Sequence, residues 1–144
     1  IAGISVFAFI STLLREIIKD AEDYDGDKKY FSNTLAVVYG KDKSKLIAQG
    51  LGIVMILMSR YFQYLQMDEN PGGEEAEMAQ AQTRALITVM YLLFAVQIPL
   101  IYVVYKLKLA NSKSDYHTLS TNMKFIMLTG IGYTLLFYYL IIKL

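Results

Sequence analysis

The sequence predicts an all-α fold, a polytopic membrane bundle of about four transmembrane helices. Hydrophobic residues make up 55% of the 144 residues, and the mean hydropathy is +0.36, which is apolar for a soluble domain of this size. The apolar residues gather in four long runs that charged segments separate. Several of the 12 tyrosines lie near the ends of these runs, as in the interfacial belts of membrane proteins.

Each apolar run is assigned to one membrane-spanning helix of about 20 residues. The first span is apolar only through Leu14 and then continues into charged residues without a glycine or proline break. It therefore has the pattern of a membrane helix whose end enters the headgroup region. The expected spans cover about residues 1–19, 46–66, 84–105 and 122–142.

Two features inside the spans predict their packing. Gln97 and Pro99 lie in the third span and predict a kink near Gln97, because proline cannot donate the helical hydrogen bond. The kink either opens a cavity or is an ordinary feature of a membrane helix. Glycines in the second and fourth spans predict close approach of neighbouring helices; they are Gly50, Gly52, Gly130 and Gly132.

The connections between the spans differ in charge. Residues 15–45 and 106–124 are rich in lysine, whereas residues 68–82 are acidic and contain a turn sequence at 70–73. By the positive-inside rule, the two lysine-rich loops face the cytoplasm. The predicted location is the bacterial inner membrane, with the aspartate-rich loop of residues 20–45 on the cytoplasmic side.

Residues 15–40 are the most charged part of the chain and carry its most informative pattern. If this stretch is helical, Asp20, Asp23 and Asp27 share one face, since they are spaced i, i+3 and i+7. Glu16 falls on the same face. Stacked carboxylates repel one another, and a divalent cation offsets this repulsion. Carboxylate oxygens suit a hard ion such as Mg²⁺.

The same stretch predicts local details of the chain path. Lys19 and Asp23 form an i, i+4 pair of opposite charge. The Asp25-Gly26 dipeptide is expected to end or bend the helix, which would place Asp27 on the loop beyond it. The sequence does not fit a calcium-binding EF-hand loop, because Ala21 and Ser32 occupy positions that need ligands. A solvated loop beside a membrane helix would carry similar charge.

Composition excludes several other classes. The formal net charge of +1 gives no case for nucleic acid binding. The absence of cysteine excludes disulfides and thiolate metal sites, and one histidine cannot form a histidine-rich site. No catalytic triad, glycine-rich phosphate loop or dinucleotide fingerprint is evident.

The charged stretch resembles the second aspartate-rich motif of the UbiA superfamily of intramembrane prenyltransferases. The resemblance covers the pattern Arg15-x4-Asp20-x2-Asp23-x2-Gly26-Asp27 and the following Asn-Thr-Leu and Val-Tyr-Gly at 33–35 and 38–40. The stretch at 115–121, Asp-Tyr-His-x-Leu-Ser-Thr, more weakly resembles a bacterial branch described as geranylgeranylglycerol-phosphate geranylgeranyltransferase-like.

The resemblance implies an enzyme activity. Members of the superfamily transfer a prenyl group from a polyprenyl diphosphate to a lipid or aromatic acceptor, with Mg²⁺ as cofactor. It implies that Asp20, Asp23 and Asp27 are the catalytic, metal-binding residues, and that Lys28, Lys29 and Arg15 contact the substrate diphosphate. Arg15 lies on a different helical face and could instead hold the helix in place. A geranylgeranylglycerol phosphate, a hydroxybenzoate and a naphthoate are all compatible acceptors.

The resemblance also implies that residues 1–144 are the C-terminal half of a larger bundle. The family carries a first aspartate-rich motif in its N-terminal half, and this sequence has none. The chain alone is therefore expected to be inactive, with the missing half of the same protein as its partner. A rival interpretation is a membrane protein without enzyme activity, either a transporter fragment or an assembly factor, whose acidic stripe is a regulatory cation site.

Two further residue groups have open interpretations. Residues 34–39 are apolar and β-branched, which favours a strand by propensity, but a lone strand at a membrane surface leaves its backbone unpaired. A short interfacial helix or ordered lid is therefore expected. His117 is the only imidazole, and its expected role is a headgroup or helix-capping contact, with acceptor binding as the alternative.

Overall fold

The computed structural model describes residues 2–67 and 75–143, and these residues form helices and turns without a strand. Three short helical segments interrupt the long ones. The elements are α1 (Ala2–Glu22), α2 (Tyr24–Lys29), α3 (Leu35–Tyr39), α4 (Lys41–Met67), α5 (Glu75–Leu92), the π-helical turn η1 (Leu93–Gln97), α6 (Ile98–Leu109) and α7 (Lys113–Lys143). This arrangement confirms the predicted all-α class. The turn sequence predicted at 70–73 lies outside the described residues.

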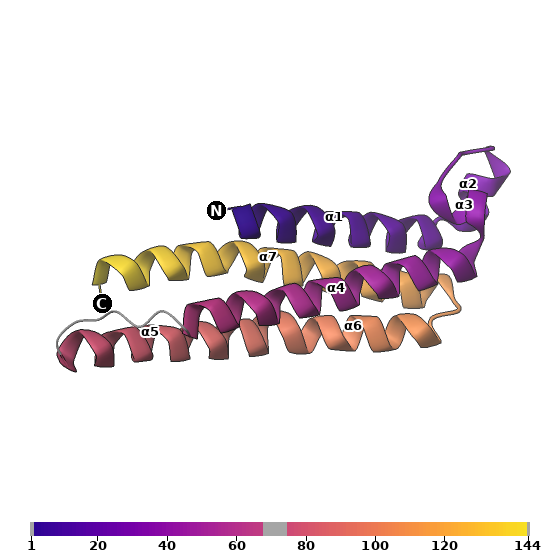
Figure 1. The fold of residues 1–144 in the computed structure, drawn as a ribbon. Helices are drawn as coiled ribbons and strands as arrows, with labels where there is room; N and C mark the ends of the chain where they lie inside the picture. Colours follow the sequence, from indigo (N-terminus) through magenta and orange to yellow (C-terminus); the bar gives the residue numbers. More distant parts are fainter. Residues whose placement is uncertain (1, 68–74, 144) are drawn as a thin grey trace.

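The long helices run side by side and form a four-membered bundle (Figure 1). Helices α5, η1 and α6 together make one continuous rod, so the four members are α1, α4, this rod and α7. Helix α1 packs on both α4 and α7, and α6 packs on both of them from the other side. The short helices α2 and α3 lie at one end of the bundle, near the connection between α6 and α7.

The exterior of this bundle suits a membrane. Large apolar side chains are exposed along every long helix, among them Phe9, Leu57, Leu86 and Leu135, which are 63–71% exposed. Within the described part of the chain, three helices are long and apolar enough to cross a bilayer, namely Lys41–Leu65, Glu77–Leu109 and Lys113–Leu140. Helix α1, the first expected span, is not among them, since its last eight residues include five charged ones.

The described helices extend beyond the expected spans, most clearly at the start of α7. Residues 106–121 were expected to be a loop, but α6 continues to Leu109 and α7 begins at Lys113. The reason is a reciprocal cap. The Asp115 carboxylate accepts from the amide of Ser112 at 2.9 Å, and the Ser112 hydroxyl accepts from the amide of Asp115 at 3.2 Å. A Ser-x-x-acid pattern of this kind starts a helix early.

The third member changes its helical geometry where a kink was predicted. Residues 93–97 form a π-helical turn directly before Pro99, which is a common way for a helix to accommodate an irregularity. Within this turn Gln97 is fully buried and donates to the side chain of Gln63 on α4 at 3.0 Å. The irregular segment therefore carries a polar contact between helices in a mostly apolar interior.

Small residues bring helices together, although only part of the prediction is correct. A Cβ atom added at Gly52 would lie 2.4 Å from Val104, whereas one at Gly50 would meet no atom within 4 Å. Gly52 is thus a close-packing point between α4 and α6, and Gly50 is exposed. In α7, added Cβ atoms would lie 3.3 Å from Phe7 at Gly130 and 2.9 Å from Tyr91 at Gly132.

Candidate functional site

The acidic stretch occupies the end of the bundle where α1 turns into α2 and α3 (Figure 1). Helix α1 ends at Glu22, and Asp23, with φ −90° and ψ 4°, precedes the six-residue helix α2 without a side-chain capping bond. The break therefore comes two residues earlier than the Asp25-Gly26 pair suggested, and Asp27 lies within α2 rather than on a loop. The amide of Asp27 still donates to the carbonyl of Asp23 at 3.0 Å, so the turn is tight.

The segment after α2 folds back onto the bundle through two unusual backbone positions. Phe31 has φ 55°, and Gly40 has φ 87° at the junction of α3 and α4. A positive φ is readily adopted by glycine, which accounts for the sharp turn at Gly40. Between them lies α3, which confirms the short helix expected at 34–39. It packs on α1 and α4.

Asp20 is the predicted site acid whose pKa burial changes most clearly. Its side chain is partly buried at the end of α1, and the Leu35 amide at the start of α3 donates to it. Burial raises the pKa of Asp20 above its ordinary value. The hydrogen bond from Leu35 opposes this rise, and the charges of Asp27, Glu16 and Asp23 add to it. These carboxylates are therefore close enough to repel one another.

Asp23 is held by two lysines from different helices. Lys19 donates to its carboxylate at 2.8 Å, which confirms the predicted i, i+4 pair. Lys113, in the first turn of α7, lies 3.9 Å from the other carboxylate oxygen. The ammonium groups partly neutralise Asp23 in the absence of a cation, so a bound metal would compete with them.

The predicted diphosphate-binding lysines lie at the surface. Lys28 and Lys29 are exposed, and their ammonium groups lie 5.7 Å from the centre of the Tyr24 ring and 6.0 Å from that of Tyr30. Lys41, at the start of α4, lies 4.7 Å from the Tyr24 ring on the same part of the molecule. The site end thus presents several cations to an incoming anion.

Arg15 differs from the other predicted site residues. Its guanidinium pairs with the neighbouring Glu16, and its Nε atom is buried without a hydrogen-bond partner. This contact lies within α1, one turn before Asp20.

The donor set fits a hard divalent cation only in part. Across residues 2–67 and 75–143, no three acidic or histidine side chains group closely enough to hold a metal ion. Mg²⁺, however, usually takes one or two carboxylates and completes its coordination with water and substrate phosphates. Asp20 and its acidic neighbours supply such carboxylates, and their mutual repulsion favours a cation.

Sequence reasoning missed the contacts that α7 makes at this end, Lys113 with Asp23 and, at shorter range, His117 with Glu22. The Nδ1 atom of His117 lies 2.8 Å from a carboxylate oxygen of Glu22. The two residues are 95 positions apart, and neither helix periodicity nor local motif could pair them. The contact joins the stretch at 115–121 to the aspartate-rich stretch, the two regions that carry the family resemblance.

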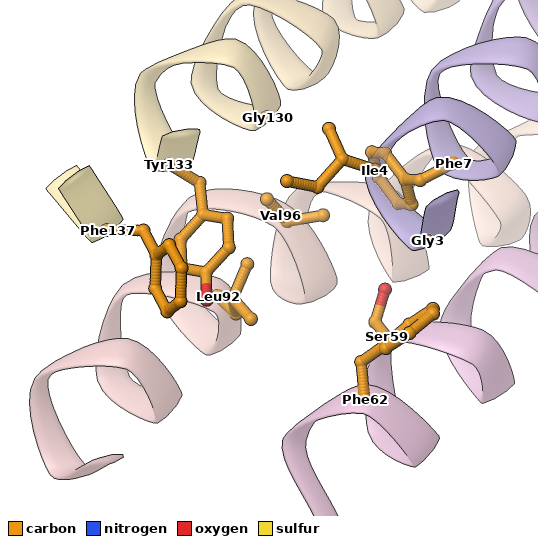
Figure 2. Close-up of a pocket in the computed structure, with 10 residues that line it drawn as sticks. All are labelled: Gly3, Ile4, Phe7, Ser59, Phe62, Leu92, Val96, Gly130, Tyr133 and Phe137. Atoms are coloured by element: carbon orange, nitrogen blue, oxygen red, sulfur yellow. The ribbon is translucent and has the colours of Figure 1, made fainter. Parts of the chain in front are cut away.

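An apolar pocket of about 200 Å³ lies between the long helices at the opposite half of the bundle. Figure 2 shows Phe7, Phe62 and Phe137 around it, with the hydroxyl of Ser59 among the few polar atoms. Gly3 and Gly130 also line it. Gly3 and Phe7 precede Asp20 by 17 and 13 residues, so about 20–25 Å of helix separates the pocket from the acids.

Fold and site define a class, a polytopic α-helical bundle with an acidic, lysine-rimmed end. Comparison with known proteins makes this more specific. The chain is 34% identical over 125 residues to the digeranylgeranylglyceryl phosphate synthase of Methanosphaera stadtmanae. It is 41% identical over 56 residues to the synthase of the same name from Pyrococcus horikoshii, and 42% identical over 55 residues to that of Saccharolobus solfataricus. No family model and no solved structure matches the chain.

These matches confirm the resemblance to the UbiA superfamily of prenyltransferases, and the chain is a homologue of its digeranylgeranylglyceryl phosphate synthases. The match to the Methanosphaera protein covers 85% of this chain and 39% of that relative. The two shorter matches cover 39% and 38% of this chain, and 20% of each relative. The chain thus spans about two fifths of the Methanosphaera relative's length. These relatives are archaeal and lend no support to the bacterial membrane predicted above.

Proposed function

We propose that the protein takes part in transferring a prenyl group from a polyprenyl diphosphate to a glycerophosphate lipid within the membrane. The observation that supports this most directly is the sequence relationship to digeranylgeranylglyceryl phosphate synthases along 85% of the chain. In the reaction, the bond between the prenyl carbon and the diphosphate oxygen breaks. A new carbon–oxygen bond forms to the acceptor hydroxyl, which releases its proton.

The acidic end of the bundle is the proposed diphosphate site. Asp20, Asp23 and Asp27 would hold Mg²⁺, and Lys28 and Lys29 would contact the diphosphate as point charges. Bound Mg²⁺ would supply Lewis-acid neutralisation of the departing diphosphate. Asp20 is suited to this role because its carboxylate is partly buried and is oriented by the amide of Leu35. Arg15, which pairs with Glu16, would hold α1 in place rather than contact substrate.

We propose that the site is completed by a further segment of the same protein, in which a first aspartate-rich motif would face this one. Two observations support this. No three potential ligands are grouped among the described residues, and the chain corresponds to 39% of the Methanosphaera relative. The intact mass of the native, membrane-extracted polypeptide tests the point. A mass near twice 16.4 kDa supports it, and a mass matching this chain contradicts it.

The test of the metal site is Asp23→Asn in the native protein, assayed for Mg²⁺-dependent prenyl transfer from geranylgeranyl diphosphate. The matched control is Asp25→Asn, because Asp25 is 88% exposed and lies on the same short helix without a proposed ligand role. We expect Asp23→Asn to lose most of the turnover and Asp25→Asn to retain it. Undiminished Mg²⁺-dependent turnover in Asp23→Asn would exclude that residue from the site.

The position of the apolar pocket bears on substrate binding. Its walls come from α1, α4, the α5–η1–α6 rod and α7, and it lies about 20–25 Å along α1 from Asp20. It is therefore too far from the acids to be the reaction centre. A long apolar chain whose diphosphate lies at Asp20 would have to extend along the bundle to reach it.

A further inference from the structure

The contact between His117 and Glu22 joins two helices at the proposed diphosphate site. Glu22 is the last residue of α1, and His117 lies in the second turn of α7. Their side chains approach to 2.8 Å. The Glu22 side chain is only 10% exposed, whereas that of His117 is 69% exposed. The nearly buried Glu22 carboxylate is thus hydrogen-bonded by the Nδ1 atom of an imidazole that is otherwise exposed to solvent.

Within the described part of the chain, His117 is the hydrogen-bonding partner of the Glu22 side chain. A carboxylate buried to this degree needs such a partner, because an unpaired buried charge is costly. The carboxylate accepts, so the imidazole donates its Nδ1–H, which fixes the tautomer of a neutral ring. Removing the imidazole would leave Glu22 to move toward solvent.

A second contact reinforces the first. Lys113, one turn before His117 on α7, lies 3.9 Å from the Asp23 carboxylate. Glu22 and Asp23 are consecutive, and they mark the place where α1 ends and α2 begins. Two adjacent acids are therefore tied to two positions on one face of α7. Of the two contacts, that of His117 is shorter and involves the more buried acid.

We propose that His117 is a positioning residue. By holding Glu22, it fixes the junction between α1 and α2 and thereby sets the relative placement of Asp20, Asp23 and Asp27. This inference rests on the proposed function, because the value of the placement lies in presenting carboxylates to a divalent cation. Residues that orient metal ligands without touching the metal typically change metal affinity or activity about 10–100-fold when they are replaced.

The experiment compares four variants of the native protein in lipid nanodiscs. His117→Ala removes the donor, and His117→Asn keeps an amide donor near the place of Nδ1. Glu22→Gln removes the charge, and the double variant combines Glu22→Gln with His117→Ala. Thr118→Ala is the matched control, since Thr118 is an exposed neighbour that bonds only to Ser114 in its own helix.

Two readouts do not depend on turnover. The first is Mn²⁺ binding to the substrate-free protein by electron paramagnetic resonance, and the second is hydrogen–deuterium exchange of the amides of residues 20–30. We expect His117→Ala to weaken Mn²⁺ binding about tenfold and to speed exchange in that segment. His117→Asn should restore most of the Mn²⁺ affinity and most of the protection from exchange. Thr118→Ala should change neither the affinity nor the exchange. The double variant should lose no more than His117→Ala alone, because without the imidazole the contact that Glu22→Gln weakens is already absent.

Several outcomes would overturn the proposal. One is a His117→Ala variant whose Mn²⁺ affinity and exchange match those of Thr118→Ala. Another is full additivity of the Glu22→Gln and His117→Ala losses, which would show that the residues act separately. If Asp23→Asn abolishes turnover in the same preparation, these results refute the role of His117 and leave the proposed function standing. If Asp23→Asn is fully active, the proposed metal site itself is wrong.

Discussion

The hydroxyl of Thr129 on α7 lies 3.0 Å from the carbonyl oxygen of Ala95 and 2.9 Å from that of Ile126 in its own helix, so its one proton is shared between the two acceptors. Ala95 is four residues before Pro99, so its carbonyl is the one that proline leaves without a helical donor. Thr129 supplies a donor to the Ala95 carbonyl from another helix. The carbonyl of Thr129 in turn accepts from the hydroxyl of Tyr91 at 2.8 Å. The contact from α7 thus adds to the hydrogen bond within the turn, where the Ile98 amide donates to the Leu93 carbonyl.

Replacing Thr129 tests this interpretation. Thr129→Val keeps the shape of the side chain and removes the donor, so the Ala95 carbonyl loses its partner. We expect a loss of about 1 kcal/mol in the free energy of unfolding, the usual scale for such bonds between membrane helices. Thermal unfolding in detergent measures it. Thr12→Val is the control, because Thr12 bonds only to Ala8 in its own helix, and an equal loss there would refute the special role of Thr129.

The buried pair of Gln63 and Gln97 should behave non-additively. Gln97→Leu removes the donor and leaves the Gln63 carbonyl oxygen unpaired in the interior, which costs about 1–3 kcal/mol. Replacing both residues with leucine removes the polar groups together and should be much less harmful than the sum of the single changes. A double-mutant cycle on unfolding free energies measures the coupling. Additive losses would mean that the two amides do not depend on one another.

Gly52 provides a steric prediction with an internal control. In Gly52→Ala, the new methyl would lie 2.4 Å from Val104 on α6, and we expect a loss of about 1–3 kcal/mol from overpacking. Gly50→Ala, two residues earlier in the same helix, adds a methyl in open space and should be neutral or slightly stabilising. Combining Gly52→Ala with Val104→Ala should restore part of the loss, and failure to do so would indicate a different cause.

These cases show how far the sequence could predict the fold. Hydropathy located the helices, and Pro99 located the irregular turn, because both signals depend on residues close together in the chain. The same local signals gave the Lys19–Asp23 pair. The start of α7 was missed although Ser112 and Asp115 encode it, since the apolar run was taken to define the helix. Gly50 and Gly52 could not be distinguished, because only the position of Val104 separates them.

For the candidate site, the sequence pointed to a set of residues but not to their geometry. The spacing of Asp20, Asp23 and Asp27 singled out the acids, but the bend at Asp23 depends on how α3 and α4 pack beneath it. The partnership of His117 with Glu22 depends on the placement of α7 against α1. Such long-range contacts follow from tertiary packing, and no local pattern in a single sequence encodes them.

Asp20→Asn should stabilise the protein while it impairs the proposed site. Burial raises the pKa of Asp20 in the folded state above its ordinary value of 3.8, so the folded protein holds this proton more tightly than the unfolded chain. The resulting contribution to stability is complete below pH 3.8 and disappears as the pH rises through the higher folded-state pKa. At neutral pH the ionised carboxylate therefore costs stability, which a neutral asparagine avoids.

The measurement is the difference in thermal unfolding midpoint between Asp20→Asn and the native protein, taken from pH 3.8 to neutral pH. We expect the variant to be the more stable at neutral pH, with a difference that shrinks toward pH 3.8. Asp25→Asn, at an exposed acid, should show no comparable trend. Added Mg²⁺ should raise the midpoint of the native protein more than that of Asp20→Asn, because a cation at the acids offsets the repulsion that raises this pKa. A variant less stable at neutral pH would mean that the bond from the Leu35 amide to the carboxylate outweighs its burial.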